Sequence, residues 1–341
     1  MNLHEFYKNK KVFITGHTGF KGSWLCKVLN MFEAKVAGYA LEPSTDPSLF
    51  KIINLENDMR SHIGDVRNTK LLCKTLSDLK PEIVIHIAAQ PLVRESYKDP
   101  VVTYQTNVMG TVNILEAIRK CDTVIHFINV TTDKVYQNNE WEWGYREIDT
   151  LDGYDPYSNS KSCSELVTGA YNRSFFTERN IKIITARAGN VIGGGDFSID
   201  RIIPDCVRAA SKRNVIAIRN PNSVRPYQHV LEPVYAYLYL IANNAEGAYN
   251  IGPHYEDCIT TETLVRLFAK YWKDAVWEDV SDTNVPHEAN FLRLDSSKIK
   301  HDFSWHPKWN VEQAVKKTVE WYQAEDPAKM MERQIEEYLH G

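Results

Sequence analysis

The sequence predicts an α/β protein with a doubly wound parallel sheet of the Rossmann-like type and a smaller C-terminal substrate-binding lobe. Three observations lead to this fold class. Short apolar runs alternate with helical patterns five times by residue 136, as expected of βαβ units. A glycine-rich turn joins the first strand to the first helix, and the regular alternation is lost in the second half. We therefore expect an NAD-binding domain that carries the catalytic residues over 1–190. A mainly substrate-binding lobe would cover 191–341, with some segments returning to the first domain.

The composition excludes several classes of protein. Forty Lys and Arg residues against 44 Asp and Glu give a net charge of −4, which offers no overall attraction to nucleic acid or to an anionic membrane surface. The six cysteines contain no C-x-x-C pair and no Cys/His cluster with zinc spacing, so we expect packed thiols in a reduced protein and no metal site. The first residues lack the pattern of a signal peptide, and no apolar run approaches about 18 residues. We expect a cytoplasmic protein that does not enter a membrane.

The first strand, residues 11–15, runs directly into a turn with glycines three residues apart, Gly16, Gly19 and Gly22, and a helical pattern follows. This is the context that a dinucleotide fingerprint requires. Gly16 and Gly19 would let the backbone approach a pyrophosphate, and Gly22 would let the helix pack on the strand. We assign Phe20, inside the turn, to the same cofactor site. The alternative is a glycine-rich turn without a ligand.

The second strand, residues 35–41, ends where dinucleotide-binding folds usually present an acid to the ribose of NAD or a basic residue to the phosphate of NADP. This chain has Ala40 at that position and Glu42 two residues further on. Because no arginine replaces the acid, NAD remains favoured, with a weakened hold on its ribose. A poorly marked third strand leads to Asp65 and Val66. We assign both to the cofactor site, with Asp65 in reach of the adenine amine.

An apolar strand at residues 83–90 ends in small side chains. We assign Ala88, Ala89 and Gln90 to the cofactor site because they leave space for a ribose or nicotinamide ring. Residues 91–99 are expected to form a loop.

A long helix is expected over residues 101–120, with Pro100 at its start. Asn107 and Thr111 lie inside it, where polar side chains are more often solvated or bonded back to the helix than catalytic.

Polar residues follow the next apolar strand, residues 124–130. Thr132, Asp133 and Lys134 stand just past it, at the carboxyl edge of the predicted sheet, where open α/β folds bind their ligands. A capping turn, in which Thr and Asp side chains bond the backbone, is the alternative. That alternative would explain the threonine and the aspartate but gives Lys134 no role, so the three residues are candidates for a catalytic site.

Tyr157 and Lys161 form a Tyr-x-x-x-Lys pattern on a helix that we expect to continue to about residue 177. The spacing of four residues puts both side chains on one face. A lysine ammonium stabilises a neighbouring phenolate, so we expect the pKa of Tyr157 to lie below its usual ~10. The phenol could then exchange a proton with a substrate hydroxyl near neutral pH. A surface tyrosine beside a solvated lysine is the alternative.

The second half of the chain supplies candidate substrate contacts. A strand at residues 181–186 ends in a glycine-rich loop that contains Asn190. Arg201, Arg219 and Arg225 would clamp a diphosphate, because guanidinium is its best bidentate partner. Each arginine taken singly is equally compatible with a surface charge. We also expect helices at 234–243 and 261–272, a strand at 249–252, a packed aromatic turn at 305–309 and an amphipathic helical tail at 311–339.

The glycine turn, the Tyr157 and Lys161 pair and the polar residues after the inner strand together resemble the extended short-chain dehydrogenase/reductase superfamily over essentially the whole chain. Within it the sequence is most similar to the nucleotide-sugar 4,6-dehydratases that use CDP-glucose. Most 4,6-dehydratases carry Asp-Glu after the threonine, whereas this chain has Asp133 and Lys134, as the CDP-glucose group does. The absent acid at Ala40 departs from the common pattern. Four further segments are similar to signatures of that group: 141–147, 153–161, 187–196 and 225–233.

The resemblance implies a lyase that converts CDP-glucose to CDP-4-keto-6-deoxyglucose and water, with NAD reduced and then restored on the same sugar. Tyr157 would take the C4 hydroxyl proton while Lys161 holds it as phenolate and orients the ribose. Asp133, kept protonated by burial, would protonate the departing C6 hydroxyl. Lys134 would act as the base at C5, and Thr132 would bond the C4 oxygen.

By the same resemblance Asn190 would bond the sugar or phosphate, and the 101–120 helix and the Tyr157 helix would pair between subunits in a homodimer or homotetramer. The product would enter deoxysugar biosynthesis, as in lipopolysaccharide O-antigen. The nearest alternative is a nucleotide-sugar epimerase or reductase of the same superfamily, which needs no acid and base pair after the inner strand. A cofactor-sensing scaffold without turnover is the alternative from another class.

Overall fold

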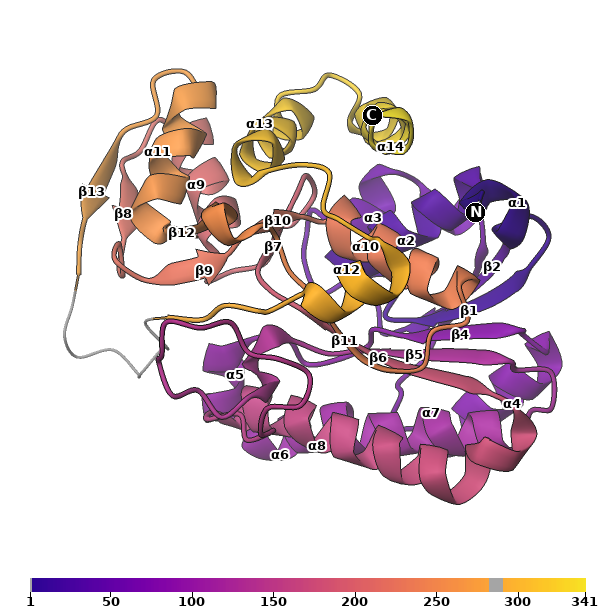
Figure 1. Ribbon diagram of the computed structural model, residues 1–341. Coiled ribbons are helices and arrows are strands. Elements are labelled where there is room, and N and C mark those ends of the chain that lie inside the picture. The colour runs from indigo at the N-terminus through magenta and orange to yellow at the C-terminus, as the bar shows by residue number, and fades with distance from the viewer. Residues whose placement is uncertain (1, 282–290) are drawn as a thin grey trace.

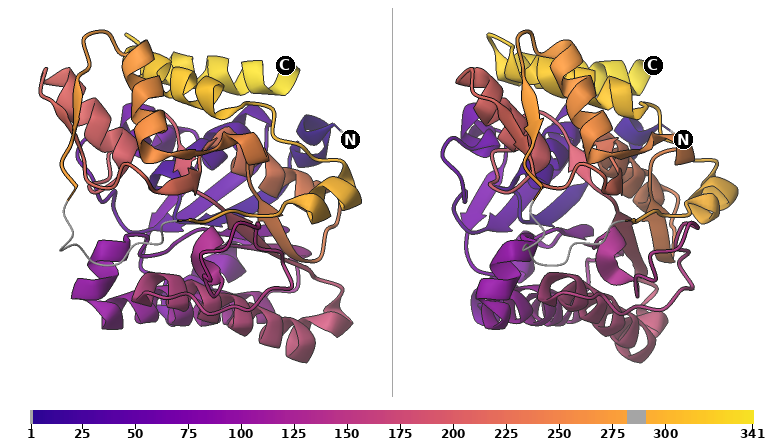
Figure 2. Two further views of the ribbon diagram at one scale, coloured as in Figure 1. Left: turned by 60° about the vertical axis from the view of Figure 1, so that its left-hand side comes forward. Right: turned by 90° about the vertical axis from the view of Figure 1, so that its left-hand side faces the viewer.

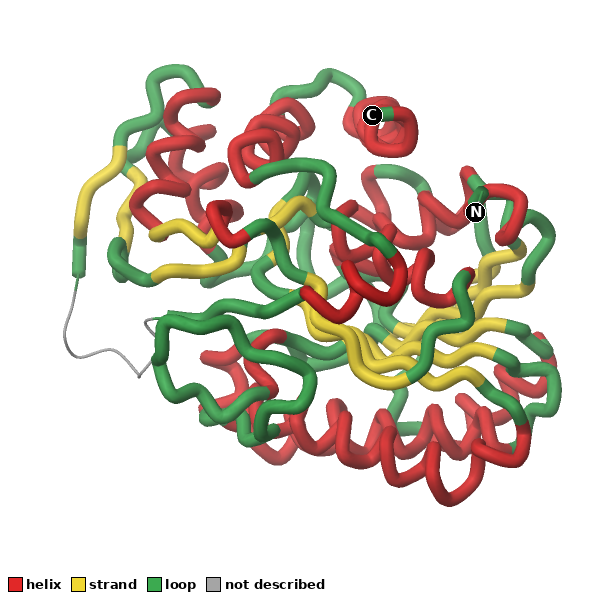
Figure 3. Tube along the Cα trace, in the orientation of Figure 1, coloured by secondary structure: helices red, strands yellow, loops and turns green. Residues whose placement is uncertain are grey.

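A central parallel sheet organises the molecule. The computed structural model describes residues 2–281 and 291–341. Figure 3 shows the strands of its main sheet side by side in yellow. Their order is β11-β6-β5-β4-β1-β2-β3, and every neighbouring pair is parallel. The predicted doubly wound fold is therefore confirmed. The strands are β1 (Lys11–Thr15), β2 (Lys35–Ala40), β3 (Arg60–Ile63), β4 (Ile83–His86), β5 (His126–Val130), β6 (Lys182–Ala188) and β11 (Gly247–Ile251).

Helices cover both faces of the sheet, which explains the continuous apolar strands. Neighbouring residues of one strand enter different cores: Ile128 packs in one apolar cluster and Phe127 in the other. Figure 1 shows α2 and α10 above the sheet and α4, α7 and α8 below it. The covering helices are α1 (Leu3–Tyr7), α2 (Phe20–Met31), α3 (Leu49–Ile52), α4 (Thr69–Leu79), α6 (Pro100–Tyr104), α7 (Gly110–Arg119), α8 (Pro156–Tyr171), α10 (Leu231–Ala242) and α12 (Ser297–Phe303).

The later part of the chain builds a lobe with its own apolar core, in which Ile203, Phe268 and Val315 are buried. The tail forms two helices, and Figure 2 shows them on the side of the molecule away from α7 and α8. The strand β11 leaves the lobe and pairs with β6 in the main sheet. The lobe contains α9 (Ile202–Ser211), α11 (Thr261–Tyr271) and α13 (Val311–Tyr322), followed by α14 (Pro327–His340). Its strand pairs are β7 (Val191–Ile192) with β10 (Gln228–His229), β8 (Ile216–Ile218) with β13 (Trp277–Asp279), and β9 (Val224–Pro226) with β12 (Cys258–Thr260).

The loop predicted over residues 91–99 is wrong, because Val93–Lys98 forms helix α5. Its N-cap, Leu92, makes no side-chain capping bond, so the sequence lacks the usual start signal. Asp99 then caps the next helix by accepting from Val102 N at 2.9 Å. A short helix that begins without a cap and ends at the cap of another has little local signature.

Two predicted ends also move. The strand predicted to reach Gln90 ends at His86, because beyond it the backbone N–H of Gln90 donates to the Asn107 side chain at 2.8 Å and not to a neighbouring strand. The helix predicted to reach residue 177 is α-helical only to Tyr171 and continues as the π-helical turn Asn172–Phe176. Within the described residues, no helix has the length and apolar character needed to cross a membrane.

Candidate active site

The candidate site lies at the carboxyl ends of β1, β4 and β5. These strands are neighbours in the sheet, so the segments that follow them meet at one edge. They are the glycine turn after β1, residues 87–90 after β4 and residues 131–136 after β5, which we call the catalytic turn. Helix α8 packs beside the catalytic turn and carries Tyr157 and Lys161.

Helix α8 fixes the Tyr157 and Lys161 pair. The Asp155 side chain caps it by accepting from Ser158 N at 3.0 Å, and Pro156 occupies its first turn, which favours a start at this point. Lys161 is buried and its Nζ donates to the Val130 carbonyl at 3.1 Å, at the end of β5. The structure therefore brings the helix and the inner strand together through Lys161.

Burial dominates the titration of this pair. It raises the pKa of Tyr157 to about 12, while a hydrogen bond with Thr132 acts in the opposite direction. The expected low pKa of Tyr157 is therefore wrong for the free protein, because the sequence spacing gave no measure of desolvation. Burial also lowers the pKa of Lys161 to about 8, against the opposing charge of Glu165.

The catalytic turn brings Thr132, Asp133 and Lys134 into direct contact. Thr132 Oγ1 donates to Asp133 Oδ1 at 2.8 Å, and Lys134 Nζ donates to the same oxygen at 3.1 Å. Lys134 Nζ also reaches Asn190 Oδ1 at 3.3 Å. The Asp133 side chain is buried, yet its Oδ2 has no hydrogen-bond partner among the described residues. Buried polar atoms normally have partners, so Oδ2 is the atom of this group that a ligand would engage.

The three glycines of the glycine turn have different surroundings: two are required by close backbone contacts, and the third faces open space. Gly16 has a φ of +83°, and a Cβ on it would lie 2.8 Å from Ala88 N; a Cβ on Gly22 would lie 2.1 Å from Gly16 O. At Gly19 a Cβ would meet only Gly16 O, at 3.5 Å. Gly19 is also the N-cap of α2 and supplies no side-chain cap. An uncapped helix start below open space fits the diphosphate of a dinucleotide.

The other predicted cofactor contacts lie around this turn. Ala88 and Ala89 are half-buried beside it, and Thr15 Oγ1 accepts from Ala88 N at 3.2 Å. Phe20 is the first residue of α2 and is partly buried against the apolar core. Small residues at 88 and 89 leave room for a planar ring at this edge.

Asp65 and Val66 follow β3, the edge strand of the sheet, which is separated from β1 by β2. The Asp65 carboxylate accepts a fork of two bonds from Arg67, at 2.9 Å from Nε and 2.6 Å from Nη2, and this arginine lowers its pKa. Val66 is buried, and its carbonyl accepts from Asn113 Nδ2 at 2.9 Å. The Arg67 pair therefore occupies much of the Asp65 carboxylate.

Gln90 is directed into the protein. Its Nε2 donates to Thr103 Oγ1 at 2.9 Å and to the Leu92 carbonyl at 3.1 Å, while Asn107 bonds both its N–H and its carbonyl. The expectation that Asn107 is solvated or bonded back to its helix is wrong, because Asn107 is buried and also donates to Ser160 Oγ at 2.9 Å. Asn107 thus joins the segment 87–90, which is predicted to contact the cofactor, to helix α8.

The three arginines predicted to bind a diphosphate each contact a different partner. Arg201 pairs with Asp196 at 3.1 Å, Arg219 with Asp200 at 3.0 Å, and Arg225 Nη1 donates to the Val224 carbonyl at 3.0 Å. Arg201 is close enough to Tyr157 to affect its pKa. Arg225 is buried at 7% exposure.

Two further candidate residues escaped the sequence analysis. Lys21, inside the glycine turn, donates to Tyr237 OH at 3.3 Å, and burial lowers its pKa to about 7, with Arg201 and Lys161 acting in the same direction. The guanidinium of Arg293 lies 3.9 Å from the Tyr255 ring centre, and its Nε has no partner among the described residues. A cation between the second and third glycines was a visible signal for Lys21; Arg293 had none.

Comparison with known proteins places the chain among nucleotide-sugar enzymes. The model of the GDP-mannose 4,6 dehydratase family matches residues 13–318. The chain is 46% identical to the CDP-glucose 4,6-dehydratase of Salmonella typhimurium, over 98% of this chain and 97% of that protein.

Two solved structures share the fold. The dTDP-glucose 4,6-dehydratase of Bacillus anthracis in complex with NAD superposes with a TM-score of 0.78 at 24% identity, covering 92% of this chain and 96% of that one. The UDP-glucose 4-epimerase of Thermus thermophilus in complex with NAD superposes with a TM-score of 0.81 at 23% identity, covering 92% and 99%. At these identities the superpositions speak for the fold alone.

Proposed function

The chain belongs to the GDP-mannose 4,6 dehydratase family, and on that premise we propose that it is an NAD-dependent hydro-lyase that converts CDP-glucose to CDP-4-keto-6-deoxyglucose and water. The observation that carries the proposal is the contact of Lys134 with Asp133 at 3.1 Å, beside a buried Asp133 Oδ2 that has no partner among residues 2–281 and 291–341. An epimerase or a reductase needs the Tyr157 and Lys161 pair, but it has no leaving hydroxyl for a separate acid and base to serve. The 46% identity to a CDP-glucose 4,6-dehydratase supports the nucleotide.

Oxidation at C4 would begin at Tyr157, which takes the C4 hydroxyl proton. Thr132, which acts on the pKa of Tyr157 through a hydrogen bond, would bond the C4 oxygen. Because burial raises the pKa of Tyr157 to about 12, binding must supply the stabilisation of its phenolate, to which the Lys161 ammonium contributes. When bound, NAD would supply the two-electron chemistry, as acceptor of the hydride from C4 and then as its donor to C6. The residues at the open space over Gly19 and the small side chains Ala88 and Ala89 would hold that cofactor.

Dehydration would follow at Asp133 and Lys134. The C4 ketone acidifies the C5 hydrogen, so Lys134 takes it as a proton while Asp133 protonates the departing C6 hydroxyl, and a C5–C6 double bond forms. The step needs a neutral amine and a carboxylic acid. One proton passing from Lys134 to Asp133 along their 3.1 Å contact gives both forms together.

Substrate contacts extend the proposal into the lobe. Asn190 is bonded to Lys134 Nζ at 3.3 Å and would bond the sugar or phosphate. Arg201, Arg219 and Arg225 would bind the diphosphate. For Arg219 this requires exchanging its bond with Asp200 for one with phosphate, so we expect its contribution to binding to be the smallest of the three.

Mass spectrometry of the protein incubated with NAD and, separately, with CDP-, dTDP-, UDP- and GDP-hexoses tests the proposal. We expect loss of one water from CDP-glucose, at a rate well above that for the other nucleotides. Incorporation of solvent deuterium into the product at C5 would identify the proton removed there. Retained binding of NAD with no water loss from any sugar would overturn the dehydratase assignment and favour the epimerase or reductase.

A homodimer, alone or paired into a tetramer, is part of the same proposal. Large apolar side chains are exposed along α6, the turn that joins it to α7, and α8, among them Val101 at 64%, Met109 at 49% and Leu166 at 58%. A four-helix contact between two copies would cover them. Light scattering of the wild type and of Leu166→Glu tests this arrangement, and a monomeric wild type would contradict it. We also propose that the enzyme acts in the cytoplasm and that its product is used to make deoxysugars of the lipopolysaccharide O-antigen.

A further inference from the structure

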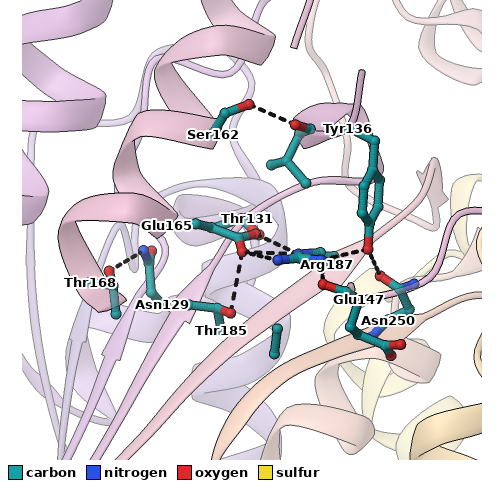
Figure 4. A network of polar contacts seen from close by, with 12 residues as sticks. Asn129, Thr131, Tyr136, Glu147, Ser162, Glu165, Thr168, Thr185, Arg187 and Asn250 are labelled. Carbon is teal, nitrogen blue, oxygen red and sulfur yellow. Dashed lines mark hydrogen bonds and ion pairs between the residues drawn. The ribbon is translucent and has the colours of Figure 1, made fainter. Parts of the chain in front are cut away.

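One buried ion pair contacts both ends of the catalytic turn. Glu165 of α8 and Arg187 of β6 lie 3% and 4% exposed and are joined by two bonds from Arg187 Nε at 2.9 Å and one from Nη2 at 2.5 Å. Figure 4 shows this pair at the centre of a polar network that includes Thr131 and Tyr136. None of the chemical steps proposed above uses either charge.

Glu165 binds the first residue of the turn. Thr131 Oγ1 donates to Glu165 Oε1 at 2.6 Å, and Thr131 N donates to the Ala186 carbonyl at 2.8 Å. Glu165 also stands one helical turn after Lys161 on α8. A bond from Thr131 to Glu165 therefore ties the start of the turn to the helix that carries Tyr157 and Lys161.

Arg187 binds the last residue of the turn. Its Nη1 donates to Tyr136 OH at 2.6 Å, and its guanidinium lies 4.9 Å from the centre of the Tyr136 ring. Tyr136 OH in turn donates to Asn250 Oδ1 at 2.7 Å, at the end of β11. Both ends of the six-residue turn are thus fixed to one rigid pair, with Asp133 and Lys134 between them.

We propose that the Glu165 and Arg187 pair positions the catalytic turn, so that Asp133 and Lys134 are aligned with the substrate atoms that Tyr157 has already oriented. The inference rests on the proposed function. A buried ion pair contributes little to stability compared with apolar residues of similar volume, so its place between two halves of the site points to geometry. Glu165 and Arg187 act through the turn and are positioning residues.

The positioning role predicts which step of the reaction is slowed when the turn is loosened. Tyr157 stands on α8 itself and keeps its place when the turn loosens. Asp133 and Lys134 depend on the two anchors at Thr131 and Tyr136. Thr132 depends on them too, but its part at C4 is one bond to the oxygen that Tyr157 deprotonates. Loosening either anchor should therefore slow the loss of water more than the oxidation at C4, since small displacements of reacting groups cost large factors in rate.

Three near-isosteric variants test this prediction in the full chain. Thr131→Val and Tyr136→Phe each remove one hydroxyl that joins the turn to the pair. Thr185→Val is the matched control, because Thr185 Oγ1 also donates to Glu165, at 3.4 Å, but lies in β6 outside the turn. In single turnovers, reduction of the nicotinamide reports oxidation at C4 and mass spectrometry of the sugar reports water loss.

We expect the two turn variants to slow water loss about tenfold or more, with oxidation at C4 slowed less than about threefold. The control should change both by less than about twofold. Equal slowing of both steps, or a control that behaves like the turn variants, would overturn the inference.

Hydrogen–deuterium exchange gives a second readout that needs no turnover. Peptides covering 131–136 should exchange faster in Thr131→Val and Tyr136→Phe than in the wild type, and unchanged in Thr185→Val. Unchanged exchange in the turn variants would overturn the positioning role even for an active enzyme. A wild type that removes no water from any nucleotide sugar while this exchange pattern holds would instead count against the proposed function alone.

Discussion

Lys134 Nζ lies 3.1 Å from Asp133 Oδ1, so the proposed base and the proposed acid contact each other before a substrate arrives. Thr132 Oγ1 donates to the same oxygen at 2.8 Å, whereas Oδ2 of the carboxylate has no partner in the described part of the chain. A substrate that places C6 at Oδ2 and C5 at Nζ would therefore meet both groups at adjacent carbon atoms.

Asp133→Asn and Lys134→Met should separate the two halves of the reaction. Water loss should fall by about 10²- to 10⁴-fold in each, the range for loss of a general acid or base. Oxidation at C4 should persist, because Tyr157 and Lys161 remain, so reduced nicotinamide should accumulate during a single turnover. Stopped-flow absorbance and mass spectrometry of the sugar measure the two steps. An undiminished rate of water loss in either variant would remove that residue from its assigned role.

Lys161→Met should abolish turnover and raise the stability of the protein. Burial lowers the pKa of Lys161 from 10.5 to about 8, so below pH 8 the wild type carries a cost of about 3 kcal/mol for this group. The variant avoids this cost, but it also loses the hydrogen bond from Lys161 to the Val130 carbonyl, which lowers its stability by about 1 kcal/mol. We therefore expect the free energy of unfolding of Lys161→Met to exceed that of the wild type by about 2 kcal/mol below pH 8.

The pH dependence gives the sign of this effect. Between pH 8 and 10.5 the unfolded chain binds a proton at Lys161 that the folded chain does not, so wild-type stability gains from this group as the pH rises. The advantage of Lys161→Met should shrink across the same window and vanish near its upper end. Urea unfolding at several pH values measures the difference. A wild type that is more stable than the variant below pH 8 would contradict the prediction.

Gly19→Ala and Gly22→Ala should affect different properties: Gly22→Ala should lower stability, whereas Gly19→Ala should weaken NAD binding. A Cβ at Gly22 would lie 2.1 Å from Gly16 O, so we expect a loss of about 2–3 kcal/mol in stability, as for other overpacked positions. A Cβ at Gly19 meets only one atom, at 3.5 Å, so the fold should tolerate it. The same Cβ would project into the space assigned to the diphosphate and should weaken NAD binding by about tenfold or more. Calorimetry gives both quantities, and unimpaired NAD binding in Gly19→Ala would place the cofactor elsewhere.

Local sequence patterns were sufficient for the main sheet. The glycine turn after β1 and the apolar strands β4 and β5 depend on neighbours in the chain, so both the strand and its role can be predicted. Strand β3 is mostly exposed at the edge of the sheet, which explains its weak apolar signal. Helix α5 was missed because its N-cap, Leu92, has no capping side chain.

Properties that depend on distant contacts could not be predicted. The Tyr157 and Lys161 spacing indicated the pair, but the pKa of Tyr157 follows from burial among residues remote in sequence. Glu165 gave no signal of its own, because its partner Arg187 stands on another element. The partners of Asn107, on residues 87–90 and on α8, likewise exist only in the folded chain.

The arginines of the lobe should differ in their effect on substrate binding. Arg225 and Arg293 have no carboxylate partner in the parts of the chain described, 2–281 and 291–341. Arg219 is 41% exposed and pairs with both Asp200 and Asp205. A charge-assisted bond to phosphate is worth about 1.5–3 kcal/mol, so Arg225→Met and Arg293→Met should raise KM for CDP-glucose by about tenfold or more.

Arg219→Met is the matched comparison, since it removes the same charge from a position where two acids already satisfy it. We expect its KM to change by less than about threefold, because phosphate would have to displace existing ion pairs. Unchanged kcat in all three variants would show that the arginines bind substrate and transition state alike. If Arg219→Met raised KM as much as Arg225→Met, binding must break the bond from Arg219 to Asp200, and Asp200→Asn should then lower KM by freeing the guanidinium.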